Sequence, residues 1–223
     1  MVGEFVQQLS IWAIPILVAI IFHEVAHGWV AFRLGDPTAS RMGRLTLNPI
    51  PHIDIFGTIV FPLLLILVRA PFVFGYAKPV PVNFQNLRNP KRDMIWVALA
   101  GPGTNLALAL VSLLLLRILV GIRLPEERTI ASAIIVPFAY MLSASASINI
   151  ILAVFNAFPI PPLDGGRVLV GLLPEPHASR VARIEPYGFL IILVLLMSRA
   201  MDAVLFPLVH IVDLFLKSMV GLA

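Results

Sequence analysis

The sequence predicts an all-α polytopic membrane protein, with about five transmembrane helices, a re-entrant segment and a short strand or extended loop region. Its 223 residues are 59% hydrophobic and only 13% charged, whereas soluble domains carry about 25% charged residues. The apolar segments are long and unbroken, which indicates helices rather than the short alternating strands of a membrane barrel. These segments recur along the chain, so we expect residues 1–223 to form a single integral membrane domain.

The first predicted span covers residues 8–34, because its apolar run is long enough to cross a bilayer, which takes about 20 residues. The Gly-Asp-Pro-Thr run at residues 35–38 ends it. Residues 39–47 then alternate partly between apolar and polar side chains, which predicts a short strand.

The next part of the chain predicts irregular structure. Residues 55–68 hold an apolar run of about 14 residues with Pro62 inside it, which fits a re-entrant or kinked segment better than a full crossing. Residues 71–90 are rich in Pro, Gly and Asn. Within them, the Lys-Pro-Val-Pro-Val-Asn run at 78–83 excludes a continuous helix and predicts an extended path.

Three long apolar runs complete the predicted layout. Residues 93–119 and 130–155 predict two further spans, and the small residues at 143–147 suit close helix packing. Residues 187–222 are interrupted by polar residues and by Pro207. They predict either one kinked span or a span followed by an interfacial helix.

The distribution of basic residues predicts the orientation. If residues 55–68 return to the side from which they enter, eleven basic residues lie on one side of the membrane and three on the other. The richer side is expected to face the cytoplasm, which puts the C-terminal end of the first helix nearer the cytoplasm. The two sets are Arg33, Arg41, Arg44, Arg69, Lys78, Arg88, Lys91, Arg92, Arg167, Arg180 and Arg183 against Arg117, Arg123 and Arg128.

The first span carries the sequence His-Glu-Val-Ala-His at residues 23–27. Ionisable groups inside an apolar run are costly and need partners. Residues four apart share a helix face, so His23 and His27 can bind one metal ion with Glu24 beside it. Imidazole suits zinc, and a carboxylate beside a zinc-bound water can act as a general base. The alternative is a pair of helix histidines bonded to backbone carbonyls or to neighbouring side chains.

A catalytic zinc ion usually has three protein ligands. The chain has no Cys, so a third ligand must be His, Asp, Glu or Asn. Asp164 is the best candidate, because it follows a proline-rich stretch and precedes two glycines that permit a tight turn. The alternative is that Leu-Asp-Gly-Gly is simply a polar turn.

Together these motifs resemble the site-2 protease family of intramembrane zinc metalloproteases, in its small prokaryotic form without PDZ or CBS domains. The resemblance implies that His23, His27 and Asp164 bind one Zn²⁺ ion, that Glu24 is the general base, and that transmembrane substrate proteins are cut within or near the bilayer. Phe56 departs from the proline expected at its position. The motifs are the His-Glu-Val-Ala-His run, Asn48-Pro49…His52-x-Asp54…Gly57-Thr58, Gly101-Pro102-x-x-Asn105 and Asn156…Pro161-Pro162-Leu163-Asp164-Gly165-Gly166.

Four other residues are candidates for supporting the site. Asn105 and Asn156 could orient a metal ligand or donate a hydrogen bond to the substrate, or could simply pack or cap helices. His52 and Asp54 could support a ligand as a pair, or could lie on a loop facing water. The segments 39–47 and 78–83 could hold an unwound substrate peptide, the first by strand pairing.

Two other classes of function remain as alternatives: a metal-binding membrane transporter and a catalytically silent scaffold that binds transmembrane helices. The expected partners are transmembrane substrate proteins and the lipid bilayer, with no nucleic acid; a homo-oligomer or a regulatory membrane partner is left open. We expect a multi-pass protein of a bacterial or archaeal cell membrane, with the catalytic site nearer the cytoplasmic side.

Overall fold

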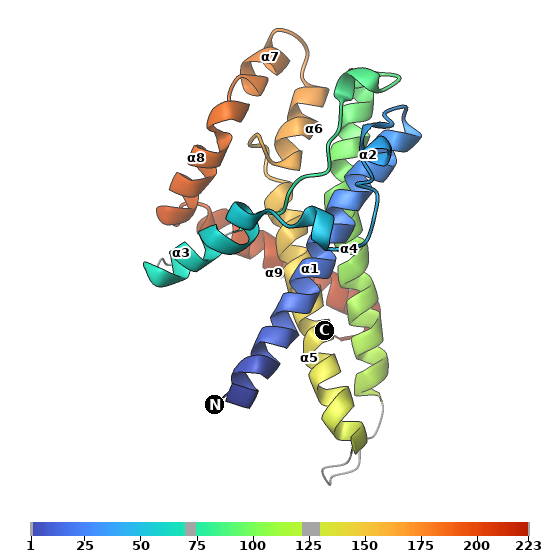
Figure 1. The fold of residues 1–223 in the computed structure, drawn as a ribbon, viewed down its shortest axis with the longest axis vertical. Coiled ribbons are helices and arrows are strands. Elements are labelled where there is room, and N and C mark those ends of the chain that lie inside the picture. The colour runs from blue at the N-terminus through green and yellow to red at the C-terminus, as the bar shows by residue number, and fades with distance from the viewer. Residues whose placement is uncertain (1, 70–74, 122–129, 223) are drawn as a thin grey trace.

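The protein is helical throughout the part that the computed structural model describes, residues 2–69, 75–121 and 130–222, and no β-strand occurs within these ranges (Figure 1). The all-α prediction is therefore confirmed. The helices in chain order are α1 (Val2–Arg33), α2 (Thr38–Arg41), η1 (Ile50–His52), η2 (Ile55–Val60), α3 (Phe61–Leu67), η3 (Phe84–Asn86), α4 (Pro90–Val120), α5 (Ile130–Asn156), α6 (Asp164–Leu172), α7 (His177–Ala182), α8 (Glu185–Met197) and α9 (Asp202–Val220).

Four helices of the described structure are long and apolar enough to cross a membrane, judged by length and composition. They comprise Ile11–Arg33 within α1, the whole of α4, Ser132–Asn156 within α5, and the whole of α9. Shorter apolar helices lie at Ile55–Leu67 and in α8. The protein is thus a multi-pass membrane protein, whereas the count of about five spans and the re-entrant path of residues 55–68 remain predictions.

The centre of the fold is a trio of helices, because α1 packs against α4 and α5, which pack against each other in opposite directions (Figure 1). Small side chains are buried on all three helices, including Ala19, Ala31, Ala98 and Ala146. Helices in a bilayer associate through such residues because the backbones can then approach closely. Helices α6, α7 and α8 lie to one side of the trio (Figure 1).

Helix α9 packs against α4 and α5. Side chains from α4, α5 and α9 form one buried apolar cluster that includes Leu113, Ile150, Leu205 and Leu216. This packing fixes the relative positions of α4 and α5. It therefore supports the parts of α4 and α5 that carry the buried side chains of Asn105 and Asn149.

The expected strand at residues 39–47 is wrong. The chain leaves α1 through Gly35, whose φ is +117°. The carboxylate of Asp36 then accepts hydrogen bonds from the backbone N–H and the hydroxyl of Thr38. These bonds favour a helical turn, α2, in place of a strand. The residues after α2 have no strand partner among the described residues, so the partly alternating pattern does not produce a sheet.

The extended path predicted for residues 78–83 is present as a non-helical segment that leads towards η3 and α4 (Figure 1). Two parts of the predicted layout cannot be compared. Residues 70–74 of the proline-rich stretch lie outside the described residues. Most of the predicted polar connection between α4 and α5 also lies outside them, at residues 122–129, including Arg123 and Arg128.

Candidate metal centre

The site begins with two histidines on one face of α1. His23 and His27 are each 8% exposed, and their Nε2 atoms lie 3.0 Å apart. The four-residue spacing places them one helical turn from each other on the same face. Their rings meet edge to face, with ring centroids 4.6 Å apart. Both Nε2 atoms therefore point into one small region beside α4.

The other nitrogen of each ring is held by α4. His23 Nδ1 lies 2.6 Å from Asn105 Oδ1, and His27 Nδ1 lies 2.7 Å from the Val97 carbonyl oxygen. Both oxygens only accept hydrogen bonds, so each Nδ1 must carry the hydrogen. The Nε2 atoms then present lone pairs, which is the arrangement that metal-binding histidines adopt.

Asp164 brings a carboxylate to the same region from the first turn of α6. Its Oδ2 lies 3.2 Å from His23 Nε2 and 3.3 Å from His27 Nε2. The side chain is buried, and Oδ2 has no hydrogen-bond partner among the described residues. Two nitrogen lone pairs and a buried carboxylate oxygen facing one another are unfavourable unless a cation lies between them.

The three atoms fit a zinc ion. Among the residues that the structure describes, His23, His27 and Asp164 form the only group of three or more His, Cys, Asp or Glu side chains that could hold a metal ion. In tetrahedral coordination with bonds of about 2.0 Å, ligand atoms lie about 3.3 Å apart, close to the separations observed here. A proton on one imidazole could bridge only two of these three atoms at a time, whereas a divalent cation can bind all three atoms.

Glycines clear the space that this arrangement needs. A Cβ at Gly101 on α4 would lie 2.6 Å from His23 Nε2 and closer still to His27 Nε2. A Cβ at Gly165 would lie within 2.5 Å of the Phe158 carbonyl oxygen, and one at Gly166 would lie 2.6 Å from the Ile160 carbonyl carbon. The glycines after Asp164 therefore let α6 begin tightly against the preceding turn, which directs the carboxylate towards α1.

A chain of buried polar groups supports His23 from behind. Asn105 and Asn149 are completely buried. The Asn105 amide donates to Asn149 Oδ1 at 2.7 Å and to the Ala19 carbonyl at 3.2 Å. Asn149 donates in turn to the Ser145 carbonyl at 2.8 Å. These bonds hold Asn105 Oδ1 towards the histidine. The sequence prediction did not include Asn149, although an asparagine inside an apolar span is itself a signal of function.

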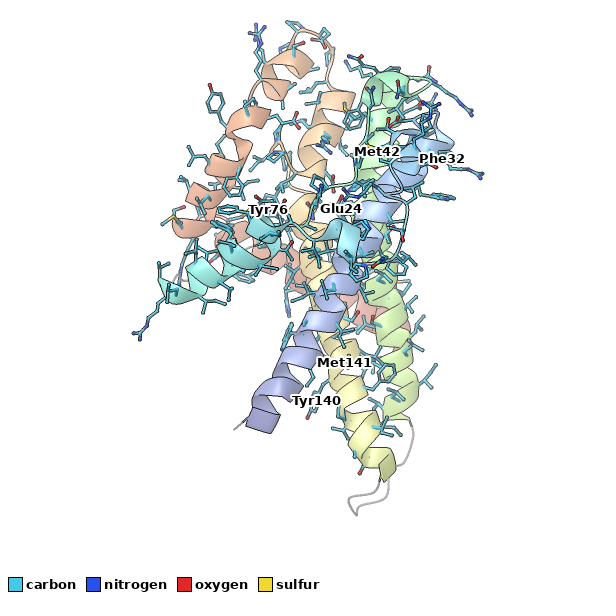
Figure 2. All side chains as sticks on the ribbon, viewed as in Figure 1. Glu24, Phe32, Met42, Tyr76, Tyr140 and Met141 are labelled. Atoms are coloured by element: carbon cyan, nitrogen blue, oxygen red, sulfur yellow. The ribbon has the colours of Figure 1, made fainter. Side chains whose placement is uncertain are left out.

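Glu24 follows His23 directly on α1. It is half-buried, and its Oε2 accepts a hydrogen bond of 2.7 Å from the backbone N–H of Val80 in the extended segment. Two segments that are 56 residues apart in the sequence therefore meet at this carboxylate (Figure 2). Neither the spacing nor the composition of the sequence indicates this contact.

Of the four supporting candidates, the structure brings only Asn105 to the histidines. The Asn156 amide donates to the Leu152 carbonyl on its own helix. His52 is buried with its Nε2 2.9 Å from the Thr46 carbonyl oxygen. Asp54 caps η2 by accepting from the Gly57 N–H at 2.7 Å. These three side chains thus make local bonds in the described structure.

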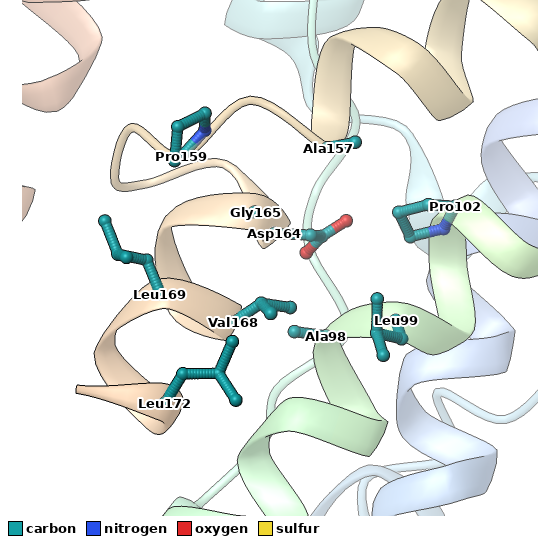
Figure 3. Close-up of a pocket in the computed structure, with 10 residues that line it drawn as sticks. All are labelled: Ala98, Leu99, Pro102, Ala157, Pro159, Asp164, Gly165, Val168, Leu169 and Leu172. Carbon is teal, nitrogen blue, oxygen red and sulfur yellow. The ribbon is translucent and has the colours of Figure 1, made fainter.

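A cavity of about 290 Å³ adjoins Asp164 between α4 and α6 (Figure 3). Its walls are almost entirely apolar, and the carboxylate is the one charged group among the residues that line it. The lining residues are Ala98, Leu99, Pro102, Ala157, Pro159, Asp164, Gly165, Val168, Leu169 and Leu172. The cavity is large enough for a bulky apolar side chain next to Asp164.

Residues 11–198 match the model of Peptidase family M50. The chain is 37% identical over 197 residues to a Bacillus subtilis (strain 168) protein named "Putative zinc metalloprotease YwhC", covering 88% of this chain and 84% of that protein. It is 31% identical over 210 residues to a Mycolicibacterium smegmatis protein named "Putative zinc metalloprotease Rip2", covering 94% and 73%. No solved structure matches the chain.

Proposed function

Since this chain belongs to Peptidase family M50, we propose that it is an intramembrane zinc metalloprotease, which hydrolyses peptide bonds of transmembrane substrate proteins within or near the bilayer. One observation carries the proposal. His23 Nε2, His27 Nε2 and Asp164 Oδ2 converge within 3.3 Å of one another, and Glu24 follows His23 directly in the sequence. This combination of a three-ligand site and an adjacent carboxylate is the arrangement that metal-assisted hydrolysis requires.

His23, His27 and Asp164 would hold a single zinc ion. When bound, zinc supplies a water of lowered pKa and polarises the carbonyl to be attacked. The protein residues fix the ligands before that chemistry begins. Asn105 and the Val97 carbonyl hold the two imidazoles in the tautomer that exposes Nε2.

Glu24 would move the proton. Its Oε2 is occupied by the Val80 N–H, so Oε1 is the oxygen that takes a proton from the attacking water. As the carbon–oxygen bond forms and the carbon–nitrogen bond breaks, Glu24 delivers this proton to the leaving amine nitrogen. One water is consumed and one peptide bond is broken; the second proton of the water also reaches the nitrogen, so the products are a carboxylate and a protonated amine.

The cavity beside Asp164 supports the assignment of a peptide substrate. Its apolar walls suit a side chain from a membrane-spanning segment, and Asp164 is the one candidate ligand that lines it. A helical substrate hides its peptide carbonyls in its own hydrogen bonds, so cleavage requires local unwinding.

The site would lie nearer the cytoplasmic face. Figure 1 shows α2, the start of α4, and α7 at one end of the fold. In the sequence, these elements and the residues next to them carry many of the basic residues, namely Arg33, Arg41, Arg44, Arg88, Lys91, Arg92, Arg180 and Arg183. A cytoplasmic position for this end follows from the usual enrichment of Lys and Arg in cytoplasmic loops.

The proposal is tested by removing and restoring the metal. Purified protein in detergent is incubated with a panel of transmembrane peptides before chelation, after chelation and after zinc is returned. We expect the wild type to cleave before chelation, to stop cleaving after it and to cleave again when zinc is returned. Asp164→Ala should show no cleavage after zinc is added. Cleavage that persists after complete removal of the metal would contradict the proposal. Zinc transport into liposomes without any cleavage would favour a transporter.

A further inference from the structure

Residues 78–83, called the strap from here on, cross α1 at Glu24. The Val80 N–H donates to Glu24 Oε2 at 2.7 Å, and the Val80 side chain is only 6% exposed. In Figure 2, Glu24 lies where the extended segment passes the first helix. The carboxylate that the proposed reaction uses as a base is therefore bonded to a backbone group from a distant, non-helical part of the chain.

Arg44 fixes the part of the strap that immediately precedes Val80. Its Nη2 donates to the Lys78 carbonyl at 2.8 Å and to the Pro79 carbonyl at 3.3 Å. Arg44 is 8% exposed, and within the described ranges no carboxylate forms an ion pair with it. A buried guanidinium is costly unless it is hydrogen-bonded. In this protein its charge is directed to two backbone carbonyls of the strap.

The strap is also tied at both ends. The Lys78 N–H donates to the His52 carbonyl at 2.9 Å, and the Asn83 N–H donates to Asp36 Oδ2 at 2.7 Å. Asp36 is completely buried and is itself oriented by the Asn86 amide at 2.9 Å. With both ends and the Arg44 contacts fixed, Val80 has little freedom to leave Glu24.

A glycine on α1 permits this close approach. Gly28 lies one turn after Glu24 on the same face. A Cβ at Gly28 would lie 2.6 Å from Val80 Cγ1 and 2.7 Å from Leu45 Cδ2. Any larger residue there would push the strap away from the helix. Arg44 and Gly28 are thus two independent features that seat Val80 against the helix that bears Glu24.

We propose that Arg44 is a positioning residue, which holds the strap so that the Val80 N–H fixes the direction of the Glu24 carboxylate. The inference rests on the proposed peptidase function. A glutamate side chain has several rotatable bonds, and a hydrogen bond to its charged carboxylate restricts them. With Oε2 held, Oε1 faces the attacking water in one orientation. Small misplacements of a catalytic group lower rates by about a hundredfold.

The first test compares Arg44→Ala and Arg44→Lys with the wild-type protein, and Arg41→Ala on the exposed surface of α2 serves as the matched control. We expect Arg44→Ala to lower kcat about ten- to a hundredfold, with KM within about twofold and zinc content unchanged. Lysine can donate to one of the two carbonyls, so Arg44→Lys should recover part of the loss. Arg41→Ala should match the wild type.

The second test addresses the hydrogen bond itself and does not depend on the folding of the Arg44 variants. Val80→Pro removes the N–H donor while retaining an extended conformation between Pro79 and Pro81. Val80→Ala keeps the donor and removes only the side chain. We expect Val80→Pro to lose kcat as Arg44→Ala does, and Val80→Ala to keep most of its activity.

Several results would overturn the inference. One is a wild-type kcat in Arg44→Ala or in Val80→Pro. Another is a higher KM with an unchanged kcat, which would make the strap a substrate-docking segment. The third is a loss of zinc in proportion to the loss of activity. Wild-type protein that binds zinc but cleaves no substrate would instead refute the proposed function. Failure of the inference and failure of the function are therefore separate outcomes.

Discussion

The close approach of Gly101 to both histidines predicts that Gly101→Ala strongly weakens metal binding without unfolding the protein. A Cβ at this position would lie 2.6 Å from His23 Nε2, whereas ordinary van der Waals contact begins at 3.4 Å. The ring must therefore move by about 0.8 Å, while metal–ligand distances in a working site vary by only about 0.2 Å. The substituted protein cannot keep both imidazoles in place.

The expected size of this effect follows from the ligand geometry. Loss of a group that only supports a ligand typically costs 10- to 100-fold in metal affinity. Displacement of the ligands themselves should cost at least about a hundredfold, or about 2.8 kcal/mol of binding free energy. Glycine to alanine inside a helix otherwise stabilises by roughly 0.5–1 kcal/mol, so a general loss of helix stability is not expected.

Gly103→Ala is the matched control, because nothing lies within 4 Å of a Cβ built at that position on the same helix. Zinc content would be measured by mass spectrometry after dialysis against a graded series of chelator, together with the melting temperature of the metal-free protein. We expect Gly103→Ala to retain zinc like the wild type. Wild-type zinc affinity in Gly101→Ala would refute the assignment of this space to a metal ion.

Three further predictions concern the surroundings of the site. Asn105→Ala should weaken zinc binding about 10- to 100-fold in a chelator competition, whereas Asn156→Ala, whose amide bonds only within its own helix, should remain near wild type. Chelation should lower the melting temperature of the wild type but not of Asp164→Ala, because only a protein that binds the ion gains stability from it; equal shifts would place the metal elsewhere. Burial alone would raise the pKa of Asp36, but hydrogen bonds from Thr38, Asn86 and Asn83 outweigh it and hold the pKa below its usual 3.8. This contribution to stability is present above the unfolded-state pKa and is lost as the pH falls through the lower native pKa. On acidification, the melting temperature of Asp36→Asn should therefore fall less than that of the wild type. Parallel plots of melting temperature against pH for the two proteins would exclude the contribution.

Helix periodicity and composition explain why part of the site is predictable from the sequence. A four-residue spacing necessarily places His23 and His27 on one face of a helix, and an apolar surrounding makes partners for them obligatory. Asp164 could be anticipated because prolines and glycines around it permit a tight approach to another element. In the structure, Asp164 Oδ2 does lie within 3.3 Å of both histidines.

The groups that hold these ligands depend on contacts that no local pattern contains. Asn149 supports Asn105 from another helix, 44 residues away, and Val80 reaches Glu24 from a non-helical segment. The strand expected at residues 39–47 is wrong for a related reason. Its partly alternating pattern predicts a strand only if a partner is available, whereas the local bonds from Thr38 to Asp36 favour a helical turn.

The most direct test of the central claim compares wild type and Glu24→Gln in detergent, with zinc content and cleavage of a panel of transmembrane substrates measured on the same samples. We predict zinc in both proteins and cleavage by the wild type alone, since the substitution leaves the three ligands in place but removes the carboxylate that accepts the proton. Cleavage by Glu24→Gln at the wild-type rate would contradict the role of Glu24. A wild-type protein without zinc, under conditions that load other zinc proteins, would contradict the metal centre itself.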